Sequence, residues 1–256
     1  MKKILLLLIV GCVASVLPTT AFAVSLGLNF AATDPDAATS SLNSDEVAGV
    51  VPQANWNNLE GNDSAVNAGL VLDDGSASGA TVSWASPNTW RSGANSAFPA
   101  GPDRKLVSGY LDSNDTAVGG VSIAVNNIDA ALRSPAYDVY VYFVSDSDLD
   151  RGGAYTIDDG SGPIVKYGST LGMPSTYIED LGTDIDNSLD GTYLRFAGLT
   201  GSSFTLTSDT TLTTPNGFRA PINAVQIVAI PEPASAVLTC CAAAVLGALA
   251  WRRRQR

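Results

Sequence analysis

The chain has 256 residues, with 25 acidic side chains, 14 basic side chains and no histidine, and its three cysteines all lie outside residues 24 to 230, the stretch called the body below. The body holds 24 of the acidic and 8 of the basic side chains, a net charge of −16, which argues against a nucleic-acid partner because such binding depends on Lys and Arg neutralising phosphates. Since the body has neither thiol nor imidazole, Cys–His and Ser–His–Asp catalysis and zinc sites with His or Cys ligands are excluded there.

Residues 1 to 23 have the order of a secretory signal peptide. The segment contains Lys2-Lys3, an apolar stretch over residues 4 to 16, and Ala21-Phe22-Ala23 as an A-x-A cleavage site. We therefore expect signal peptidase to cleave after Ala23, with Ala21 and Ala23 as the small residues of the site. A second interpretation takes Ile9-Val10-Gly11-Cys12 as a lipoprotein box with Cys12 lipidated, although the apolar stretch continues past Cys12.

The body, residues 24 to 230, has the pattern of a single all-β domain. Short runs of Val, Ile, Tyr, Phe and Thr alternate with turns of Gly, Asp, Asn, Ser and Pro, and no stretch of a dozen residues keeps an apolar 3.6-residue period. The predicted strands are residues 25–30, 70–72, 80–84, 105–111, 121–125, 137–144, 154–157, 164–167, 193–196, 203–207 and 224–228. Eleven short strands predict two packed sheets, a β-sandwich.

Two of these strands differ in the surroundings that their side chains predict. Residues 136 to 144 carry apolar side chains on both faces, which is typical of a central strand. Residues 203 to 207 alternate strictly, with Phe204 and Leu206 on one face and Thr205 and Thr207 on the other, which indicates one solvated face.

Three segments of the body resemble the first, middle and last strands of malectin-like or galactose-binding-like jelly rolls. They are Leu26-Gly27-Leu28-Asn29-Phe30, residues 136 to 143, and Pro221-Ile222-Asn223-Ala224-Val225-Gln226-Ile227-Val228. The resemblance implies a jelly-roll-like sandwich and a family that often binds carbohydrate. It transfers no sugar-binding residue, because the loops that would hold a sugar do not match.

Two tryptophans are candidates for stacking on a sugar ring. Trp56 and Trp90 lie among Asn and Ser in predicted loops, where an indole could stack between amide donors. The alternative is that each fills an edge of the hydrophobic core, as large aromatic residues usually do. Trp84 lies in a predicted strand and is assigned to the core.

An acidic loop after the central strand suggests a calcium site. Asp146, Asp148 and Asp150 alternate along the loop and are followed by Gly152-Gly153, a spacing that allows three carboxylates to face one hard cation. Calcium is the one cofactor that the sequence suggests. The alternative is an acidic turn in which Asp side chains cap backbone amides; a second acidic stretch, with Asp180, Asp184, Asp186 and Asp190, is more loosely spaced.

The C-terminal 26 residues combine three features of a membrane sorting signal. Pro231-Glu232-Pro233 is followed by an uncharged apolar run of 18 residues, Ala234 to Trp251, and then by Arg252-Arg253-Arg254-Gln255-Arg256. As a helix the run would be about 27 Å long, enough to cross a hydrocarbon core, with the arginines on the cytoplasmic side. The alternative, a buried core helix, conflicts with the arginine cluster and with the absence of a polar face.

This order of tripeptide, apolar span and arginine cluster resembles the PEP-CTERM sorting signal of Gram-negative bacteria that export proteins into an extracellular polymeric matrix. The resemblance implies processing near Pro231, Glu232 and Pro233 by an exosortase, a membrane cysteine transpeptidase, with Arg252, Arg253 and Arg254 in the cytoplasm. It also implies a transient inner-membrane anchor and a body that ends at the cell surface or in the matrix.

The sequence thus predicts an exported, non-catalytic surface or matrix protein, with a carbohydrate-binding module of the exopolysaccharide as the alternative. A glycoside hydrolase is a more remote possibility, since it needs two carboxyl groups about 5 to 10 Å apart and sequence spacing does not establish such a pair.

Overall fold

The computed structural model describes residues 23–31, 40–91, 98–113, 120–145, 151–170, 174–183, 191–209 and 219–231. Residues 1 to 22 of the expected signal peptide (residues 1 to 23) and the expected helix over residues 234 to 251 lie outside these ranges. Within them, no helix is long and apolar enough to cross a membrane.

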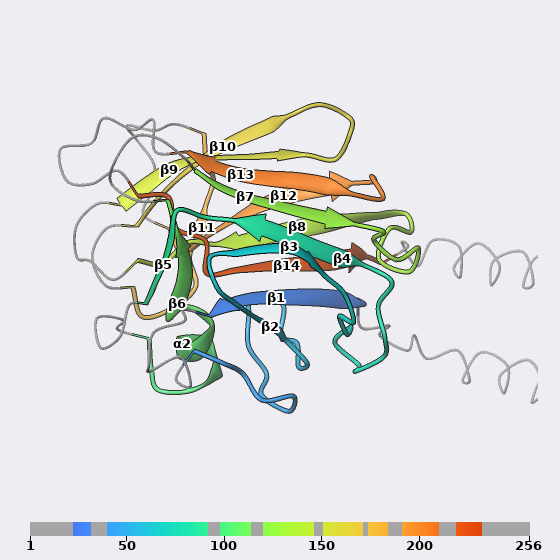
Figure 1. The fold of residues 1–256 in the computed structure, drawn as a ribbon, viewed down its shortest axis with the longest axis horizontal. Coiled ribbons are helices and arrows are strands. Elements are labelled where there is room, and N and C mark those ends of the chain that lie inside the picture. The colour runs from blue at the N-terminus through green and yellow to red at the C-terminus, as the bar shows by residue number, and fades with distance from the viewer. Residues whose placement is uncertain are drawn as a thin grey trace, which may run out of the picture.

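The described residues form a β-sandwich of two six-stranded sheets, drawn as two layers in Figure 1 with the second sheet nearer the viewer. In strand order, the first sheet consists of β11 (Glu179–Asp180), β12 (Tyr193–Leu199), β8 (Ala136–Tyr142), β14 (Ala224–Ile230), β1 (Ser25–Ala31) and β2 (Asn57–Glu60). The second consists of β10 (Ile164–Thr170), β9 (Arg151–Asp158), β13 (Phe204–Asp209), β7 (Val121–Asn126), β4 (Thr81–Ala85) and β3 (Asp63–Asn67). The structure also has a two-stranded sheet, formed by β5 (Asn88–Arg91) and β6 (Gly109–Asp112). A short helix, α2 (Pro102–Leu106), precedes β6. The predicted all-β sandwich is confirmed.

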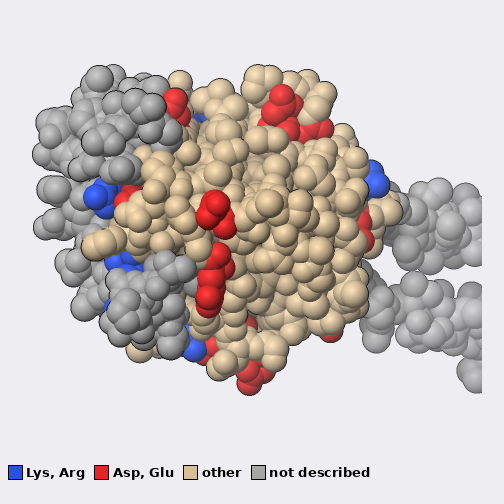
Figure 2. All heavy atoms as spheres, in the orientation of Figure 1, with Lys and Arg blue, Asp and Glu red and all other residues tan. Residues whose placement is uncertain are grey.

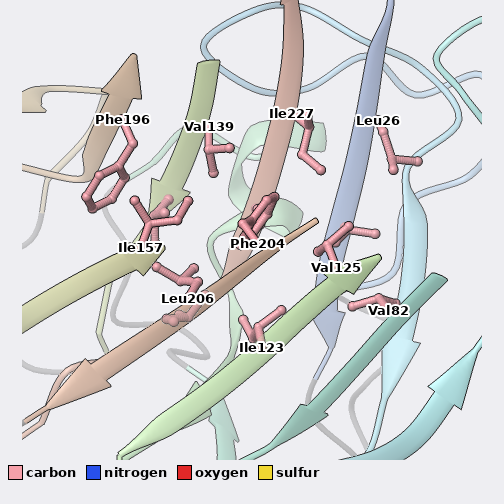
Figure 3. Close-up of a cluster of buried hydrophobic side chains, with 14 of the residues drawn as sticks. Leu26, Val82, Ile123, Val125, Val139, Ile157, Phe196, Phe204, Leu206 and Ile227 are labelled. Atoms are coloured by element: carbon pink, nitrogen blue, oxygen red, sulfur yellow. The ribbon is translucent and has the colours of Figure 1, made fainter. Parts of the chain in front are cut away.

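The hydrophobic core lies between the two sheets. Val139 of β8 and Ile227 of β14 point inward from the first sheet, and Ile123 of β7 and Leu206 of β13 point inward from the second, all fully buried (Figure 3). Burying such a side chain contributes roughly 1.5–3 kcal/mol. Alternation of inward apolar and outward polar side chains along each strand therefore fixes which face of each sheet meets the core.

The two strand environments expected from the sequence are both present. β8 lies between β12 and β14 and is buried on both faces, with Val139 in the main core and Tyr142 in a second cluster on the other side. β13 buries Phe204 and Leu206, whereas Thr205 is exposed and Thr207 half-buried on the opposite face.

The first and last strands of the body are neighbours in the first sheet. β1 and β14 pair antiparallel, with Ser25 opposite Val228, and the amide of Ala229 donates to the carbonyl of Val24 at 2.9 Å. The start of β1 and the end of β14 therefore lie side by side, at the right of Figure 1.

Two predicted strands differ from the structure. Residues 105 to 111 are not one strand: Pro102 begins α2, whose end reaches Leu106, and β6 starts only at Gly109. Proline is favoured in a first helical turn, and Asp103 near the start with Lys105 near the end suits the helix dipole. Residues 70 to 72 contribute one isolated bridge, from Val71 to Ala77.

Four strands were not predicted: β2, β3, β5 and β11. They are short, and β2, β3 and β11 lie at sheet edges, where one missing neighbour allows polar side chains to remain solvated. They consequently lack the apolar pattern that indicates a strand.

Candidate functional site

The outer face of the second sheet is built from small side chains, most of them polar. On β4, β7, β9 and β13 the apolar residues turn inward, so the alternate residues point away from the core. The outward residues are Thr81, Ser83 and Ala85 of β4, Ser122, Ala124 and Asn126 of β7, Ala154, Thr156 and Asp158 of β9, and Thr205, Thr207 and Asp209 of β13. We call this surface the hydroxyl face.

The strand register aligns these residues in rows across the sheet. One row joins Ser83, Ala124, Thr205 and Asp158, and the next joins Ala85, Ser122, Thr207 and Thr156. Neighbouring strands are about 4.8 Å apart, and successive outward residues on a strand are about 7 Å apart. The hydroxyl face is therefore a regular grid of short side chains.

A shallow, open surface groove of about 470 Å³ lies at the β9–β13 side of the hydroxyl face. Its lining comes from Thr156 and Asp158 of β9, Gly160 and Pro163 of the β9–β10 turn, and Thr205 and Thr207 of β13. The strands supply its floor, and the turn supplies a wall.

The polar groups in the groove have spare hydrogen-bonding capacity. Asp158 Oδ1 accepts the backbone amides of Gly160 at 2.8 Å and Gly162 at 3.3 Å, whereas no donor within the described residues reaches Asp158 Oδ2. The hydroxyls of Thr156, Thr205 and Thr207 likewise have no protein partner in the described part of the chain. Each hydroxyl can donate one hydrogen bond and accept others, so the groove presents donors and acceptors to whatever enters it.

The wall of the groove is fixed by a second aspartate. Asp159 accepts the backbone amides of Thr200 and Gly201, both at 3.0 Å, and that of Ser161 at 3.1 Å, which ties the β9–β10 turn to the turn before β13. Partial burial of this carboxyl opposes ionisation, but hydrogen bonds from Ser161, Thr200 and Gly201 outweigh it and lower the pKa of Asp159 to about 2. The carboxylate therefore remains charged at neutral pH and holds the turn in place.

The charge on the hydroxyl face is acidic only. Its charged residues are Asp158 and Asp209, and the outward positions of β4, β7, β9 and β13 named above include no Lys or Arg. Figure 2, in the same orientation as Figure 1, shows a broad neutral surface with a few acidic clusters, and with Lys and Arg towards its edges.

Much of the outer face of the first sheet is covered, in contrast. Residues 40 to 56 and α2 pack on it and form a second hydrophobic cluster, which includes Leu42, Trp56, Leu106 and Tyr142. Tyr142 donates to Gln226 Oε1 at 2.8 Å and accepts from the amide of Val50 at 2.8 Å. Its burial raises the pKa of its hydroxyl above the usual range, so this tyrosine stays neutral.

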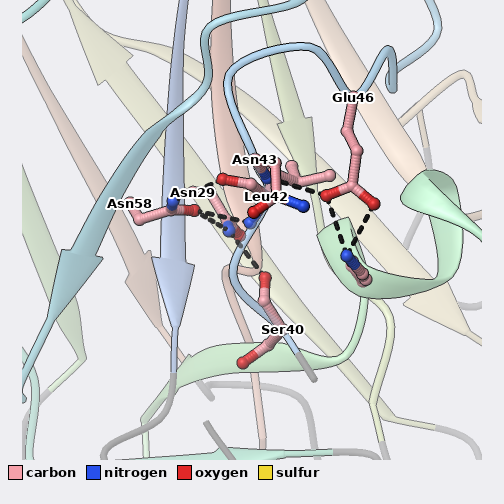
Figure 4. Close-up of polar contacts among 7 residues, drawn as sticks. Asn29, Ser40, Leu42, Asn43, Glu46 and Asn58 are labelled. Atoms are coloured by element: carbon pink, nitrogen blue, oxygen red, sulfur yellow. Dashed lines mark hydrogen bonds and ion pairs between the residues drawn. The ribbon is translucent and has the colours of Figure 1, made fainter. Parts of the chain in front are cut away.

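Amide side chains attach residues 40 to 56, the covering segment, to the first sheet (Figure 4). Asn29 Nδ2 donates to the carbonyl of Ser40 and to Asn58 Oδ1, both at 2.8 Å, and Asn58 in turn bonds the backbone of Leu42. Glu46 of the covering segment forms an ion pair with Lys105 of α2 at 2.6 Å. The part of this face beneath residues 40 to 56 and α2 is therefore sealed by protein contacts, whereas Arg195 of β12 remains exposed.

The structure places Trp56 and Trp90 in different environments. Trp56 is 4% exposed, and its Nε1 donates to the carbonyls of Ala48 and Gln53. A Cβ added at Gly27 would lie 2.5 Å from the Trp56 ring, and one at Gly49 would lie 2.9 Å from it. Trp56 is thus a core aromatic residue, which was the alternative to sugar stacking. Neither face of its indole ring is open to a sugar.

Trp90 is 46% exposed and lies on β5, directly opposite Tyr110 of β6. It is therefore on a different element from Trp56, and the structure does not bring the two tryptophans together on one sheet face. Trp84 is in the core as predicted, with its ring edge-on to Phe30 at 5.7 Å.

Most residues of the other predicted sites lie outside the described ranges: Ala21, Asp146, Asp148, Asp150, Glu232, Pro233, Arg252, Arg253 and Arg254. Ala23 and Pro231 are described at the two ends of the body, with Pro231 exposed. Among described residues, no group of three or more His, Cys, Asp or Glu could hold a metal ion. Asp180, from the second acidic stretch, is buried and accepts the amides of Ser169 and Gly182.

No family model and no curated protein matches this chain. The chemistry of the groove therefore has to be inferred from its own residues. Sequence reasoning placed Thr205 and Thr207 on a solvated face but did not single out Thr156 or Asp158, because the groove exists only once β9 and β13 pair.

Proposed function

We propose that this protein is an exported, non-catalytic surface or matrix protein, processed by signal peptidase and sorted by an exosortase-type transpeptidase. Two observations together carry the proposal. The end segments have the order of export and sorting signals, and within the described residues no segment seals the hydroxyl face of the sandwich. In this proposal the C-terminal segment anchors the protein transiently in the inner membrane before the body reaches the cell surface or the extracellular matrix. The body would be a jelly-roll-like sandwich whose exposed face makes the contacts.

The sorting step can be tested by changing Pro231 and Pro233 to Ala in the full-length protein. Export should continue, because the apolar span and the arginines anchor the chain independently of the tripeptide. Uncleaved protein should then accumulate in the inner membrane, detected by cell fractionation and by the intact mass of the C-terminal segment. Release with an unchanged C-terminal mass would count against the proposal.

A carbohydrate-binding module is the second candidate, and the groove over β9 and β13 favours it. The threonine hydroxyls and the Asp158 carboxylate oxygen that have no partner among the described residues are groups that bind sugar hydroxyls without reacting with them. Sugar stacking by Trp90, and calcium binding by Asp146, Asp148 and Asp150, remain predictions.

The groove offers less to a glycoside hydrolase. Such an enzyme needs two carboxyl groups flanking the scissile bond, and among the residues that line the groove the carboxyl group is that of Asp158 alone. Incubating the full-length protein with a soluble glucan and measuring new reducing ends tests this point, with no release above background expected.

A further inference from the structure

We propose that the groove on the hydroxyl face, lined by Thr156, Asp158, Thr205 and Thr207, binds an uncharged glycan chain and discriminates against anionic polysaccharides. The proposal rests on the carbohydrate-binding role put forward above and assigns it a location, a ligand class and a selectivity. Three properties of the described residues support it: unpaired polar groups, their spacing and their charge.

The first property is the unsatisfied hydrogen-bonding capacity of the lining. Three threonine hydroxyls and Asp158 Oδ2 have no protein partner within the described residues, and all four line one groove. A sugar hydroxyl both donates and accepts, so it pairs with a threonine, and it donates to a carboxylate in a stronger, charge-assisted hydrogen bond. A ligand rich in hydroxyls matches this lining better than an apolar one.

The second property is the rigidity and regularity of the lining. Thr205 stands opposite Asp158, and Thr207 stands opposite Thr156, on two adjacent strands in the interior of the sheet. Two polar rows about 7 Å apart fit a polymer that repeats its hydroxyls, and β-branched threonine loses little rotamer freedom on binding. Pro163 and Gly160, in the wall, give the ring carbons an apolar contact.

The third property is charge. The outward side chains around the groove carry Asp158 and Asp209 and no base, and the body as a whole has a net charge of −16. A polymer that bears carboxylates or sulfates would be repelled at contact distance, because salt screens such charges only beyond about 8 Å. The groove therefore accepts a neutral glycan and rejects an anionic one.

The test uses the full-length protein in a detergent without a sugar headgroup. Co-sedimentation is measured with insoluble cellulose, with insoluble β-1,3-glucan and with calcium-free crosslinked alginate, the anionic probe. We expect binding to at least one of the two neutral glycans and none to alginate. The triple variant Thr156→Val, Thr205→Val, Thr207→Val should weaken the neutral binding about tenfold or more, since it removes several ligand hydrogen bonds.

Thr81→Val is the matched control, because Thr81 points out of the same face from β4, away from the groove. It should change binding by less than about twofold. Asp158→Asn should also weaken binding, while its retained oxygen can still accept the Gly160 amide. Equal unfolding midpoints for wild type and variants establish that each is folded.

Several outcomes would overturn the inference. Undiminished binding by the triple variant would place the glycan elsewhere, and preferential binding to alginate would refute the charge argument. Self-sedimentation that rises with protein concentration and disappears in the triple variant would mean that the face binds a second copy. Failure to bind either neutral glycan, by a protein that still fractionates with the matrix and is processed at its tail, would refute this inference and leave the proposed sorting and matrix role standing.

Discussion

The outer faces of the two sheets are constructed in opposite ways. On the first sheet, β8 and β14 present Tyr142 and Gln226, large polar side chains that are buried under residues 40 to 56 and bonded to that segment. On the second sheet, β9 and β13 present short threonines that are exposed or half-buried and whose hydroxyls bond no group in the described chain. A polar side chain that is buried must find a partner to avoid a desolvation cost, whereas one that is exposed can keep its bonding capacity for a ligand. The comparison separates side chains that hold the fold together from side chains that are available for binding.

Removing the indole from the covered side should have the largest effect. Trp56→Ala is expected to lower the free energy of unfolding by about 3–5 kcal/mol, because it leaves a cavity beneath residues 40 to 56. The exposed Trp90 provides the matched control, and Trp90→Ala should cost less than about 1 kcal/mol. Denaturant unfolding followed by circular dichroism measures both, and equal losses would contradict the assignment of Trp56 to the core.

Removing one buried hydroxyl from the covered side should lower the free energy of unfolding by less than removing the indole, but by a measurable amount. Tyr142→Phe leaves the Val50 amide and Gln226 Oε1 without their partner, so a loss of about 1–3 kcal/mol is expected. Tyr140, on the same strand and half-buried, makes no hydrogen bond through its hydroxyl within the described chain. Tyr140→Phe should therefore stay within about 0.5 kcal/mol of wild type, and a similar loss in both variants would show that the buried hydrogen bonds contribute nothing specific.

The same substitution made at two threonines compares a bonded and an unbonded hydroxyl directly. Thr192 is buried, and its hydroxyl accepts the Ile178 amide at 2.8 Å and donates to the Ile178 carbonyl. Thr192→Val should lower the free energy of unfolding by about 1–2 kcal/mol. Thr205→Val on the hydroxyl face should change it by less than about 0.5 kcal/mol. Thermal unfolding of the two variants measures the difference, and a large loss for Thr205→Val would mean that the face is structural.

The smallest expected effect concerns acid. Because folding lowers the pKa of Asp159 from 3.8 to about 2, its stabilising contribution is complete above pH 4 and is lost as the pH falls towards 2. Asp159→Asn should be less stable than wild type by about 1 kcal/mol at pH 6, a modest figure because the carboxyl is only partly buried and solvent screens its charge. The two unfolding temperatures should converge near pH 2, and a difference that is constant with pH would refute the charge-based clamp.

The sequence was informative where a strand alternates strongly or is buried on both faces. The position of β8 in the interior of its sheet and the solvated face of β13 follow from patterns within a few residues, Tyr137 to Val144 and Phe204 to Thr207. The polar edge strands β2 and β3 lack that pattern, and Pro102 with Asp103 makes a helix from a stretch that looked like a strand. The groove could not be predicted from the sequence, because Thr156 and Thr205 become neighbours only through the long-range pairing of β9 with β13. Trp56 does lie outside the strands, just before β2, but its burial was missed because nothing in its own segment indicates that Gly27 and Gly49 leave space for its ring.

The pairing of β1 with β14 has a consequence for how the chain folds. Synthesis delivers Ser25 early and its partner Val228 some two hundred residues later, so the closing strand of the first sheet arrives last. Until then, the edges of β1 and β8 have unpaired amides and carbonyls beside strongly apolar side chains, a combination that promotes aggregation. Folding that depends on such distant contacts is intrinsically slow. Nascent chains stopped before residue 224 should therefore remain sensitive to protease. The sandwich should become protease-resistant only once the seven residues of β14 have been synthesised and paired.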